Sequence, residues 1–336
     1  MPLLDEARHF EAVVGSVVAQ DYDGEIEFIF VDNGSTDGTR ELLAGLADRD
    51  PRVRVVDNPR RGIPISLNMG LAAATGEIFV RMDAHSEYPP DYVGRGVEII
   101  QSGRADWVAG PAYARGGGRW SRWVAAALLT RLGVGGADFR SSRKEVYTDT
   151  AFGGVVPRAT LQSLGGWDER WVVNEDAELA TRARAAGVRI LLAPSMAAYY
   201  IPRDDPRALA EQYWRYGVWR ARTSVEHPES MRPSHLLPPL VTIALGAAAL
   251  SFLLPRRGVF RALRAGRAAA LLYKAVVLAE SGRAAHGDAE GAARLAVVYP
   301  VMHIAWGAGN IAGFARFGSP VPALRVVAAK LASRLT

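Results

Sequence analysis

The stretch from Phe79 to Tyr88, F-V-R-M-D-A-H-S-E-Y, decides the fold and marks the first candidate site. A hydrophobic strand over Glu77 to Met82 ends in Asp83, one residue intervenes, and His85 follows. Alternate residues at a strand end point to the same side, so we expect Asp83 and His85 to converge. Their carboxylate and imidazole could hold a divalent cation, which could in turn hold a diphosphate. A strand end with a capping Asp83 and a surface His85 would give the same pattern, so the stretch alone leaves both interpretations open.

Helical and extended patterns alternate around this stretch. We predict helices over 7–20, 39–47, 65–74 and 92–101, and strands over 26–31, 53–56, 77–82 and 107–110. This alternation indicates an α/β fold with a mostly parallel sheet covered by helices. Ligands of such sheets bind beyond the carboxyl ends of the strands, and both Asp32 and Asp83 fall at such ends.

The first residues of the chain show no element of this fold. Met1 to Glu6 has neither the basic region nor the apolar run of a signal peptide. No strand pattern precedes the first predicted helix. Because an α/β domain rarely opens on a helix, we expect the first strand to be missing from this sequence.

The composition narrows the class of protein. The chain has 336 residues and no cysteine, which excludes disulfides, thiolate metal sites and cysteine nucleophiles. Residues 233–336 hold 12 Lys and Arg against 3 Asp and Glu, whereas residues 1–232 hold 28 against 32. An acidic body without a basic stripe argues against nucleic acid as a partner. A basic, hydrophobic tail favours a membrane with anionic lipid.

The tail contains two long uncharged stretches. Leu236 to Pro255 and Leu295 to Ala315 each approach the ~20 residues that cross a bilayer, although buried core helices of a soluble protein would look similar. Gly309 and Gly313 form a small-xxx-small pair that would allow close helix packing. Five arginines crowd the connection after the first stretch and should keep it cytosolic: Arg256, Arg257, Arg261, Arg264 and Arg267. We predict a boundary between a catalytic domain over 1–232 and a membrane-associated helical tail over 233–336.

Two further motifs carry acidic residues at element boundaries. Asp32 to Thr39 reads D-N-G-S-T-D-G-T directly after a predicted strand. It could bind a nucleoside through Asp32, or it could simply form a turn and cap the next helix. Asn174-Glu175-Asp176 opens a predicted helix, where acidic side chains also complement the helix dipole by ~0.3–1 kcal/mol. A diphosphate would favour a nearby arginine, which makes Arg61 a candidate.

Several motifs together resemble family 2 glycosyltransferases of the GT-A fold. They occur in the order D-E-A-R, V-D-N-G-S-T-D-G-T, R-M-D-A-H, G-G-W-D-E, N-E-D and Q-Y-W-R-Y-G, beginning at Asp5, Val31, Arg81, Gly165, Asn174 and Gln212. The D-A-H form and the tail motif H-I-A-W-G-A-G, beginning at His303, resemble the membrane-associated ExoA-like group of succinoglycan biosynthesis. The resemblance covers nearly the whole chain.

The resemblance implies a donor site. Glu6 and Asp32 would bind the nucleoside, and Asp83 would contact the metal and the diphosphate. His85 stands where many relatives have a second aspartate. Imidazole with carboxylate suits Mn²⁺, whereas carboxylate and phosphate oxygens alone suit Mg²⁺, so either ion fits the pattern.

The resemblance also implies catalytic residues. Asp176 matches the catalytic base of the family, with Glu175 beside it, because an inverting transfer needs one carboxylate to take a proton from the attacking hydroxyl. Gln212 and Arg215 resemble a region that helps hold acceptor and diphosphate in processive relatives. An amphipathic helix at the membrane surface would explain the same residues.

We therefore expect an inverting glycosyltransferase at the cell membrane, with its catalytic domain on the cytoplasmic side. It would move a sugar from a nucleotide-sugar donor, most simply a UDP-sugar, to a lipid-linked or polysaccharide acceptor. A polyprenyl-phosphate sugar synthase and a non-catalytic membrane scaffold of the same fold are the alternatives. A nicotinamide-dependent enzyme is disfavoured because no G-x-G-x-x-G follows a first strand.

Overall fold

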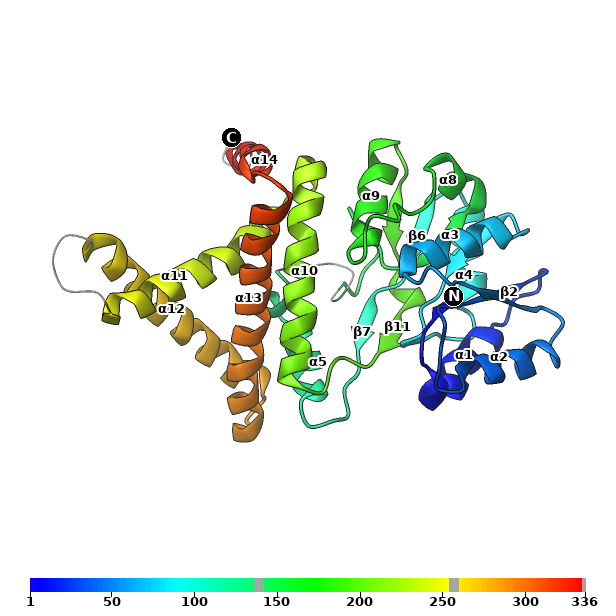
Figure 1. The fold of residues 1–336 in the computed structure, drawn as a ribbon, viewed down its shortest axis with the longest axis horizontal. Coiled ribbons are helices and arrows are strands. Elements are labelled where there is room, and N and C mark those ends of the chain that lie inside the picture. Colours follow the sequence, from blue (N-terminus) through cyan, green and yellow to red (C-terminus); the bar gives the residue numbers. More distant parts are fainter. Residues whose placement is uncertain (136–139, 141, 254–259, 334–336) are drawn as a thin grey trace. The chain divides into compact units, whose positions relative to one another are not determined.

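The computed structural model describes residues 1–135, 140, 142–253 and 260–333 (Figure 1). The chain divides into two compact units. Unit 1 comprises Met1–Tyr113 and Asp138–Ile201, and unit 2 comprises Ala114–Ala137 and Pro202–Thr336. Compact units need not coincide with functional domains, so the boundary at residues 232 and 233 stays a prediction.

Unit 1 begins with a parallel three-stranded sheet in the order β1-β2-β3. Its strands are β1 (Pro2–Leu3), β2 (Phe28–Asp32) and β3 (Val53–Asp57). The elements between them are η1 (Ala7–His9), α1 (Phe10–Val18) and α2 (Thr39–Ala47), and α3 (Ile63–Ala73) follows β3. The hydrophobic alternation of the sequence therefore produces the predicted βα pattern here, with Phe30 and Leu43 fully buried.

The expectation that no strand precedes the first helix is wrong. Pro2–Leu3 pairs in parallel with β2, and the Leu3 carbonyl accepts the Asn33 N–H at 2.9 Å. Leu3 is only 2% exposed. Two residues are too few to show a period-two pattern, so this strand left no signal in the sequence.

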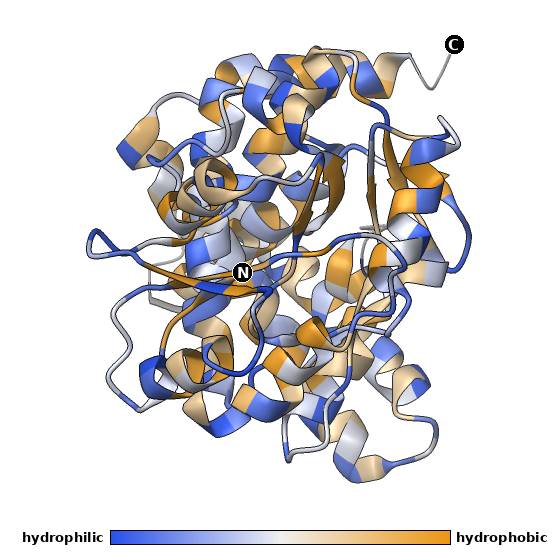
Figure 2. Cartoon of the chain, turned by 90° about the vertical axis from the view of Figure 1, so that its right-hand side faces the viewer, coloured by the Kyte–Doolittle hydropathy of each residue, from blue (hydrophilic) through white to orange (hydrophobic). Residues whose placement is uncertain are grey.

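The second sheet of unit 1 is mixed, in the order β4-β9-β6-β10-β8. Its strands are β4 (Ile78–Arg81), β6 (Trp107–Ala109), β8 (Val146–Tyr147), β9 (Gly154–Pro157) and β10 (Ile190–Leu192). Strands β6 and β10 run parallel, whereas β9 runs antiparallel to β4 and to β6. Figure 2 shows that strands of the chain are largely hydrophobic, as expected for a sheet buried on both faces.

Unit 1 also contains a small third sheet and further helices. A small third sheet has the order β5-β11-β7, formed by β5 (Ser86–Glu87), β7 (Ala112–Ala114) and β11 (Ala198–Tyr200). The helices are α4 (Tyr92–Gln101), α8 (Arg158–Ser163), α9 (Glu175–Ala185) and η2 (Pro194–Met196). Helix α9 begins at Glu175, as the acidic helix start predicted, and Asn174 precedes it with a φ of 71°.

Unit 2 is helical. Its main helices are α10 (Pro206–Glu226), α11 (Leu237–Leu253), α12 (Phe260–Ala284), α13 (Ala289–Phe317) and α14 (Val321–Ala332). Shorter elements are α5 (Ser121–Leu128), α6 (Arg131–Val134), η3 (Pro228–Ser230) and η4 (Pro233–Leu236). Helices α10 and α13 lie side by side along much of their length (Figure 1).

The predicted close packing at Gly309 and Gly313 is confirmed. A Cβ at Gly309 would clash with the backbone carbonyl of Trp214 on α10, and one at Gly313 would lie 2.6 Å from the Val218 carbonyl. Two helical segments, Pro233–Ser251 and Ala289–Phe317, are long and apolar enough to cross a bilayer. Pro255, Arg256 and Arg257, which entered the sequence predictions, lie outside the described residues.

Candidate active site

One buried arginine gathers three carboxylates in unit 1. Arg81 Nε donates to Asp83 Oδ1 at 3.0 Å, and Nη2 donates to Asp83 Oδ2 at 3.3 Å and to Glu175 Oε1 at 3.2 Å. Nη1 donates to Asp176 Oδ1. The Arg81 side chain is 4% exposed, and those of Asp83, Glu175 and Asp176 are 11%, 9% and 10% exposed.

Two elements bring these residues together. Arg81 is the last residue of β4, and Asp83 follows two residues later on the same side of the chain. Glu175 and Asp176 open α9, whose first N–H groups favour negative charge. Buried charges are tolerated when they are paired, so the guanidinium and the helix start together explain why three carboxylates can be buried here.

The pKa of Asp176 is raised to about 7, first by burial and then by the nearby Glu175 and Asp83 carboxylates, against the opposing charge of Arg81. Burial disfavours the charge of Arg81, but Asp176, Asp83 and Glu175 hold its pKa well above its usual value. Asp176 can therefore exchange a proton near neutral pH while Arg81 stays charged. A carboxyl group of this kind is suited to general base chemistry.

A second hydrogen bond to Asp176 comes from Trp167, in the turn that precedes α9. Trp167 is 3% exposed, and its Nε1 donates to Asp176 Oδ1 at 3.4 Å. Asn68 on α3 fixes this turn, because its Oδ1 accepts the Trp167 N–H at 2.9 Å and its Nδ2 donates to the Trp167 carbonyl at 2.8 Å. The turn requires Gly166, whose φ is 69° and whose missing Cβ would clash with Asn68 Oδ1.

Glu6 and His85, predicted for the nucleoside and the metal, lie together. His85 Nδ1 is 3.2 Å from Glu6 Oε1, and the His85 side chain is 70% exposed while that of Glu6 is 15% exposed. Both flank the carboxyl ends of β1 and β4. Asp83 instead turns its carboxylate toward Arg81, and its backbone N–H donates to the Tyr88 hydroxyl at 2.7 Å. Burial raises the pKa of that Tyr88 hydroxyl well above its usual value.

Asp32 lies at the end of β2 and is 1% exposed. Ser35 binds its carboxylate through the hydroxyl at 2.6 Å and through the backbone N–H at 3.2 Å. The neighbouring Asn33 anchors the edge of the sheet, because its Oδ1 accepts bonds from Gly62, Asn58 and Ser66. The turn and the polar edge therefore form one bonded network.

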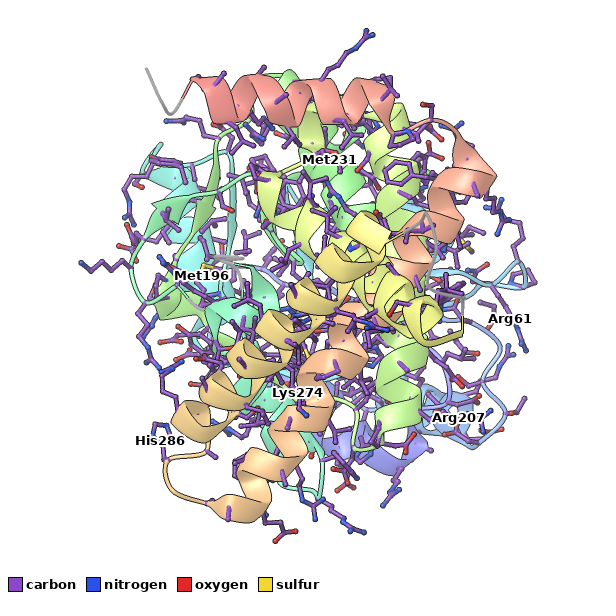
Figure 3. The ribbon with its side chains drawn as sticks, turned by 90° about the vertical axis from the view of Figure 1, so that its left-hand side faces the viewer. Arg61, Met196, Arg207, Met231, Lys274 and His286 are labelled. Atoms are coloured by element: carbon purple, nitrogen blue, oxygen red, sulfur yellow. The ribbon has the colours of Figure 1, made fainter. Side chains whose placement is uncertain are left out.

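Arg61 extends from the loop before α3. Its φ is 54°, its side chain is exposed, and its Nη2 donates to the Gly34 carbonyl at 3.3 Å (Figure 3). The preceding Arg60 pairs with Glu169 at 3.0 Å. Arg61 is thus linked to the turn that follows Asp32.

Gln212 and Arg215 lie on α10 in unit 2. Gln212 Nε2 donates to the Tyr216 hydroxyl at 3.1 Å, and Arg215 is exposed. Their roles stay predictions, as do those of the site residues of unit 1.

Asp83 and His85 remain the candidate ligands of unit 1 for a divalent cation. Among the described residues no group of three or more His, Asp or Glu side chains is arranged to hold a metal ion. Asp83 and His85 could offer an oxygen and a nitrogen. A cation that keeps waters and shares substrate phosphate oxygens needs only one or two such ligands. Three carboxyl groups surround the single guanidinium of Arg81. This excess of negative charge also favours the binding of a cation.

The sequence reasoning did not assign Arg81, Asn68 or Trp167 to the site. Arg81 carried a usable signal, because a charged residue inside a hydrophobic strand pattern must find buried partners. Asn68 and Trp167 had no such signal, since their contact joins residues 99 positions apart.

Comparison with known proteins agrees with this architecture. Residues 1–156 match the family described as "Glycosyl transferase family 2". The chain is 32% identical over 312 residues to "Succinoglycan biosynthesis protein ExoA" of Rhizobium meliloti, covering 92% of each chain. It is 22% identical over 218 residues to "Glycosyltransferase AglE" of Haloferax volcanii, covering 63% of this chain and 69% of that one.

A solved structure shares the fold. The mannosyltransferase PcManGT from Pyrobaculum calidifontis, in complex with GDP-Man and Mn²⁺, superposes with a TM-score of 0.57 at 21% identity. The match covers 92% of this chain and 85% of that one, which confirms the predicted GT-A fold. The sequence identity to ExoA extends over both units, and the predicted resemblance is confirmed. The chain therefore belongs to glycosyl transferase family 2, as a glycosyltransferase of the ExoA-like group.

Proposed function

We propose that this glycosyltransferase catalyses an inverting transfer from a nucleotide-sugar, most simply a UDP-sugar, to a hydroxyl of a lipid-linked or polysaccharide acceptor. The observation that carries the proposal is the junction at Arg81, which joins Asp83 to Asp176 in one buried cluster. An inverting transfer needs a base on the acceptor side and positive charge on the leaving-group side. Asp176 and the surroundings of Asp83 supply these two parts.

Asp176 acts as the base. Its pKa of about 7 lets it accept the proton of an attacking hydroxyl at neutral pH. Arg81 and Trp167 orient its carboxylate through bonds to Oδ1, which leaves Oδ2 for the acceptor. Glu175 also accepts a hydrogen bond from the Arg81 guanidinium. Its negative charge raises the pKa of Asp176 and so makes Asp176 a stronger base.

Asp83 and His85 hold Mg²⁺ or Mn²⁺. When bound, the ion would stabilise the charge that develops on the departing diphosphate. Glu6 orients the His85 ring through the 3.2 Å contact, and Arg61 adds a guanidinium beside the turn that follows Asp32. The Mn²⁺ of the PcManGT complex supports a divalent ion in this fold.

Asp32 and Glu6 bind the nucleoside. Asp32 is the last residue of β2 and Glu6 follows β1, so both lie at the carboxyl edge of the parallel sheet, where α/β proteins place nucleotides. PcManGT was solved with GDP-Man, which supports a nucleotide-sugar donor for the fold.

We infer that the enzyme works at the cytoplasmic face of the cell membrane, with unit 2 as its membrane-associated part; its two long apolar helical segments support this proposal. Helix α11 exposes Leu240 and Ile243 at 58% and 57%, as a helix in lipid would. Gln212 and Arg215 on α10 help hold an acceptor at this surface. Membrane association raises the effective concentration of a lipid-borne acceptor.

Transfer by the full chain tests the proposal. Purified protein in detergent is incubated with UDP-, GDP- and CDP-sugars, a membrane lipid extract, and Mg²⁺ or Mn²⁺. We expect metal-dependent loss of one donor, and Asp176→Asn should lower the rate about 10²–10⁴-fold. Asp91→Asn is the matched control, because Asp91 is also an aspartate at the start of a helix but pairs with Arg95 at the surface.

The products separate the alternatives. A lipid product that is labile to mild acid and contains one phosphate indicates a polyprenyl-phosphate sugar synthase. Nucleotide binding without turnover of any donor indicates a non-catalytic scaffold. Either result would refute the transfer proposed here.

A further inference from the structure

Phe152 lies directly against the Arg81 cluster and stays exposed. The guanidinium carbon of Arg81 lies over the Phe152 ring, 5.5 Å from its centre. Arg81 is 4% exposed, whereas Phe152 is 39% exposed. The ring therefore covers a buried charged group on one side and still meets solvent.

The backbone after Phe152 is fixed against β4. Gly154 opens β9 and pairs with Arg81, the last residue of β4. The Gly153 carbonyl accepts a hydrogen bond from the buried Trp107 Nε1 at 2.9 Å. Gly153 has a φ of 63°, and a Cβ there would lie 2.9 Å from the Arg81 carbonyl, so a glycine lets the chain pass this close to β4.

The backbone before Phe152 is fixed as well. Ala151 is 2% exposed, and the Thr148 N–H donates to the Ile190 carbonyl at 3.0 Å. A side chain on a backbone that is held on both sides loses little freedom when a ligand binds, which favours binding.

The face of an aromatic ring can bind both a cation and a sugar. The face carries negative charge, so it attracts the Arg81 guanidinium. The C–H groups on one face of a pyranose ring are apolar and weakly positive, so they can stack on the same kind of surface. Ligand sites commonly combine such aromatic surfaces with a few polar groups that fix the orientation of the ligand.

The position of the ring favours the acceptor sugar. The guanidinium that Phe152 covers also donates to Asp176 Oδ1. An acceptor must bring its hydroxyl to Asp176, so the group that carries this hydroxyl has to lie near Arg81. Phe152 offers an exposed apolar surface at that place.

We propose that Phe152 binds a sugar ring of the acceptor by stacking, with a hydroxyl of that ring directed to Asp176. The acceptor is then a glycan, free or linked to a lipid, and not a bare lipid phosphate. This inference rests on the proposed function, because it names the acceptor class of the same site.

Calorimetric titration of the full chain, in a detergent that contains no sugar, tests the stacking without any transfer. The probes are methyl β-glucoside, methyl β-galactoside, cellobiose and lactose, with sorbitol as a polyol that has no ring. We expect at least one of the sugars to bind and sorbitol not to bind. Phe152→Leu, which keeps an apolar cover on Arg81, should weaken binding about threefold to tenfold. Phe152→Tyr keeps the ring and should stay within about twofold of wild type.

Tyr147→Leu is the matched control, because it removes another exposed ring of unit 1 whose hydroxyl bonds to the Arg104 carbonyl. Thermal unfolding checks that each variant is folded. The inference is refuted if no sugar binds, if sorbitol binds equally well, or if Tyr147→Leu weakens binding as much as Phe152→Leu.

Initial rates separate this inference from the proposed function. Where a sugar probe serves as acceptor, Phe152→Leu should raise its KM by the same factor and leave the KM for the donor unchanged. A raised KM for the donor alone would assign the ring to the donor sugar and overturn the inference. Sugar binding that depends on Phe152 in a protein that transfers no sugar would refute the proposed function and leave the stacking site in place.

Discussion

Arg81 Nη1 donates to Asp176 Oδ1, and this bond joins the end of β4 to the start of α9 across 95 positions of sequence. The same guanidinium binds both oxygens of Asp83. One residue therefore fixes the distance between the proposed base and the proposed diphosphate side of the site. This arrangement makes Arg81 a positioning residue for Asp176.

Replacement of Arg81 should cost both stability and activity. Arg81→Met leaves three buried carboxyl groups without their cation, and we expect a loss of about 3–5 kcal/mol in unfolding free energy. Arg81→Lys should recover part of that stability but little transfer activity, because an ammonium cannot reproduce the planar fork. Thermal unfolding and initial rates measure the two effects.

Arg52→Met is the matched control, since Arg52 forms an exposed pair with Asp50 in the same unit. Such a pair contributes only about 0.2–1 kcal/mol. A similar loss for Arg81→Met and Arg52→Met would show that the buried cluster is not needed to hold unit 1 together.

The raised pKa of Asp176 predicts opposite pH trends for activity and stability. The folded pKa is about 7 and the ordinary value is 3.8, so between these values the folded state binds more protons than the unfolded state. Stability should therefore fall as pH rises from 4 to 7, by at most about 1.4 kcal/mol per pH unit. Transfer activity should rise through pH 7 as the base loses its proton.

Comparing the stability of wild type with that of Asp176→Asn isolates the contribution of the Asp176 carboxyl group. Above pH 7 the variant should gain stability relative to wild type, because the buried charge is gone. Thermal midpoints of both proteins across pH 4–8 measure the effect. Parallel curves for the two proteins would contradict a raised pKa at Asp176.

The sequence predicted the elements of unit 1 well because their signals are local. Helix α2 begins and ends where it was predicted, at Thr39 and Ala47, because a periodic apolar face lies between polar turns. The same holds for α4, Tyr92–Gln101. The arrangement of β9 between β4 and β6 was not predicted, because antiparallel pairing of distant segments leaves no mark on either segment alone.

The site was predicted as a set of residues and not as a network. Asp83 was selected from its place at a strand end and Asp176 through family resemblance, but nothing local says that one arginine joins them. The period-two argument directed attention to Asp83 and His85, whereas the same argument applied to Arg81 and Asp83 identifies the pair that is bonded. Long-range bonds decide such pairings, and a single sequence does not contain them.

Gly166 should be less replaceable than its neighbour Gly165. Both have positive φ, 69° and 76°, so an alanine strains the backbone by about 1 kcal/mol at either position. A Cβ at Gly166 also clashes with Asn68 Oδ1, whereas one at Gly165 meets nothing within 4 Å. Gly166→Ala should therefore destabilise unit 1 by about 1–3 kcal/mol more than Gly165→Ala.

Activity should follow the same order, because the Asn68 clash displaces Trp167 and so releases one bond to Asp176. Thermal unfolding and initial rates of the two variants are compared directly. Equal losses for Gly165→Ala and Gly166→Ala would show that the contact with Asn68 does not position Trp167.

Glu6→Gln tests whether His85 serves the metal. A carboxylate that bonds one ring nitrogen of a metal-binding histidine fixes the ring and raises its basicity, and its loss costs about 10–100-fold in metal affinity. Because Glu6 Oε1 lies 3.2 Å from His85 Nδ1, we expect Glu6→Gln to raise the Mn²⁺ concentration for half-maximal activity by that factor. Glu11→Gln, an exposed change in the first turn of α1, is the control. If Glu6 serves only the nucleoside, the variant will raise the KM for the donor and leave the Mn²⁺ dependence unchanged, and the pairing with His85 will then have no part in metal binding.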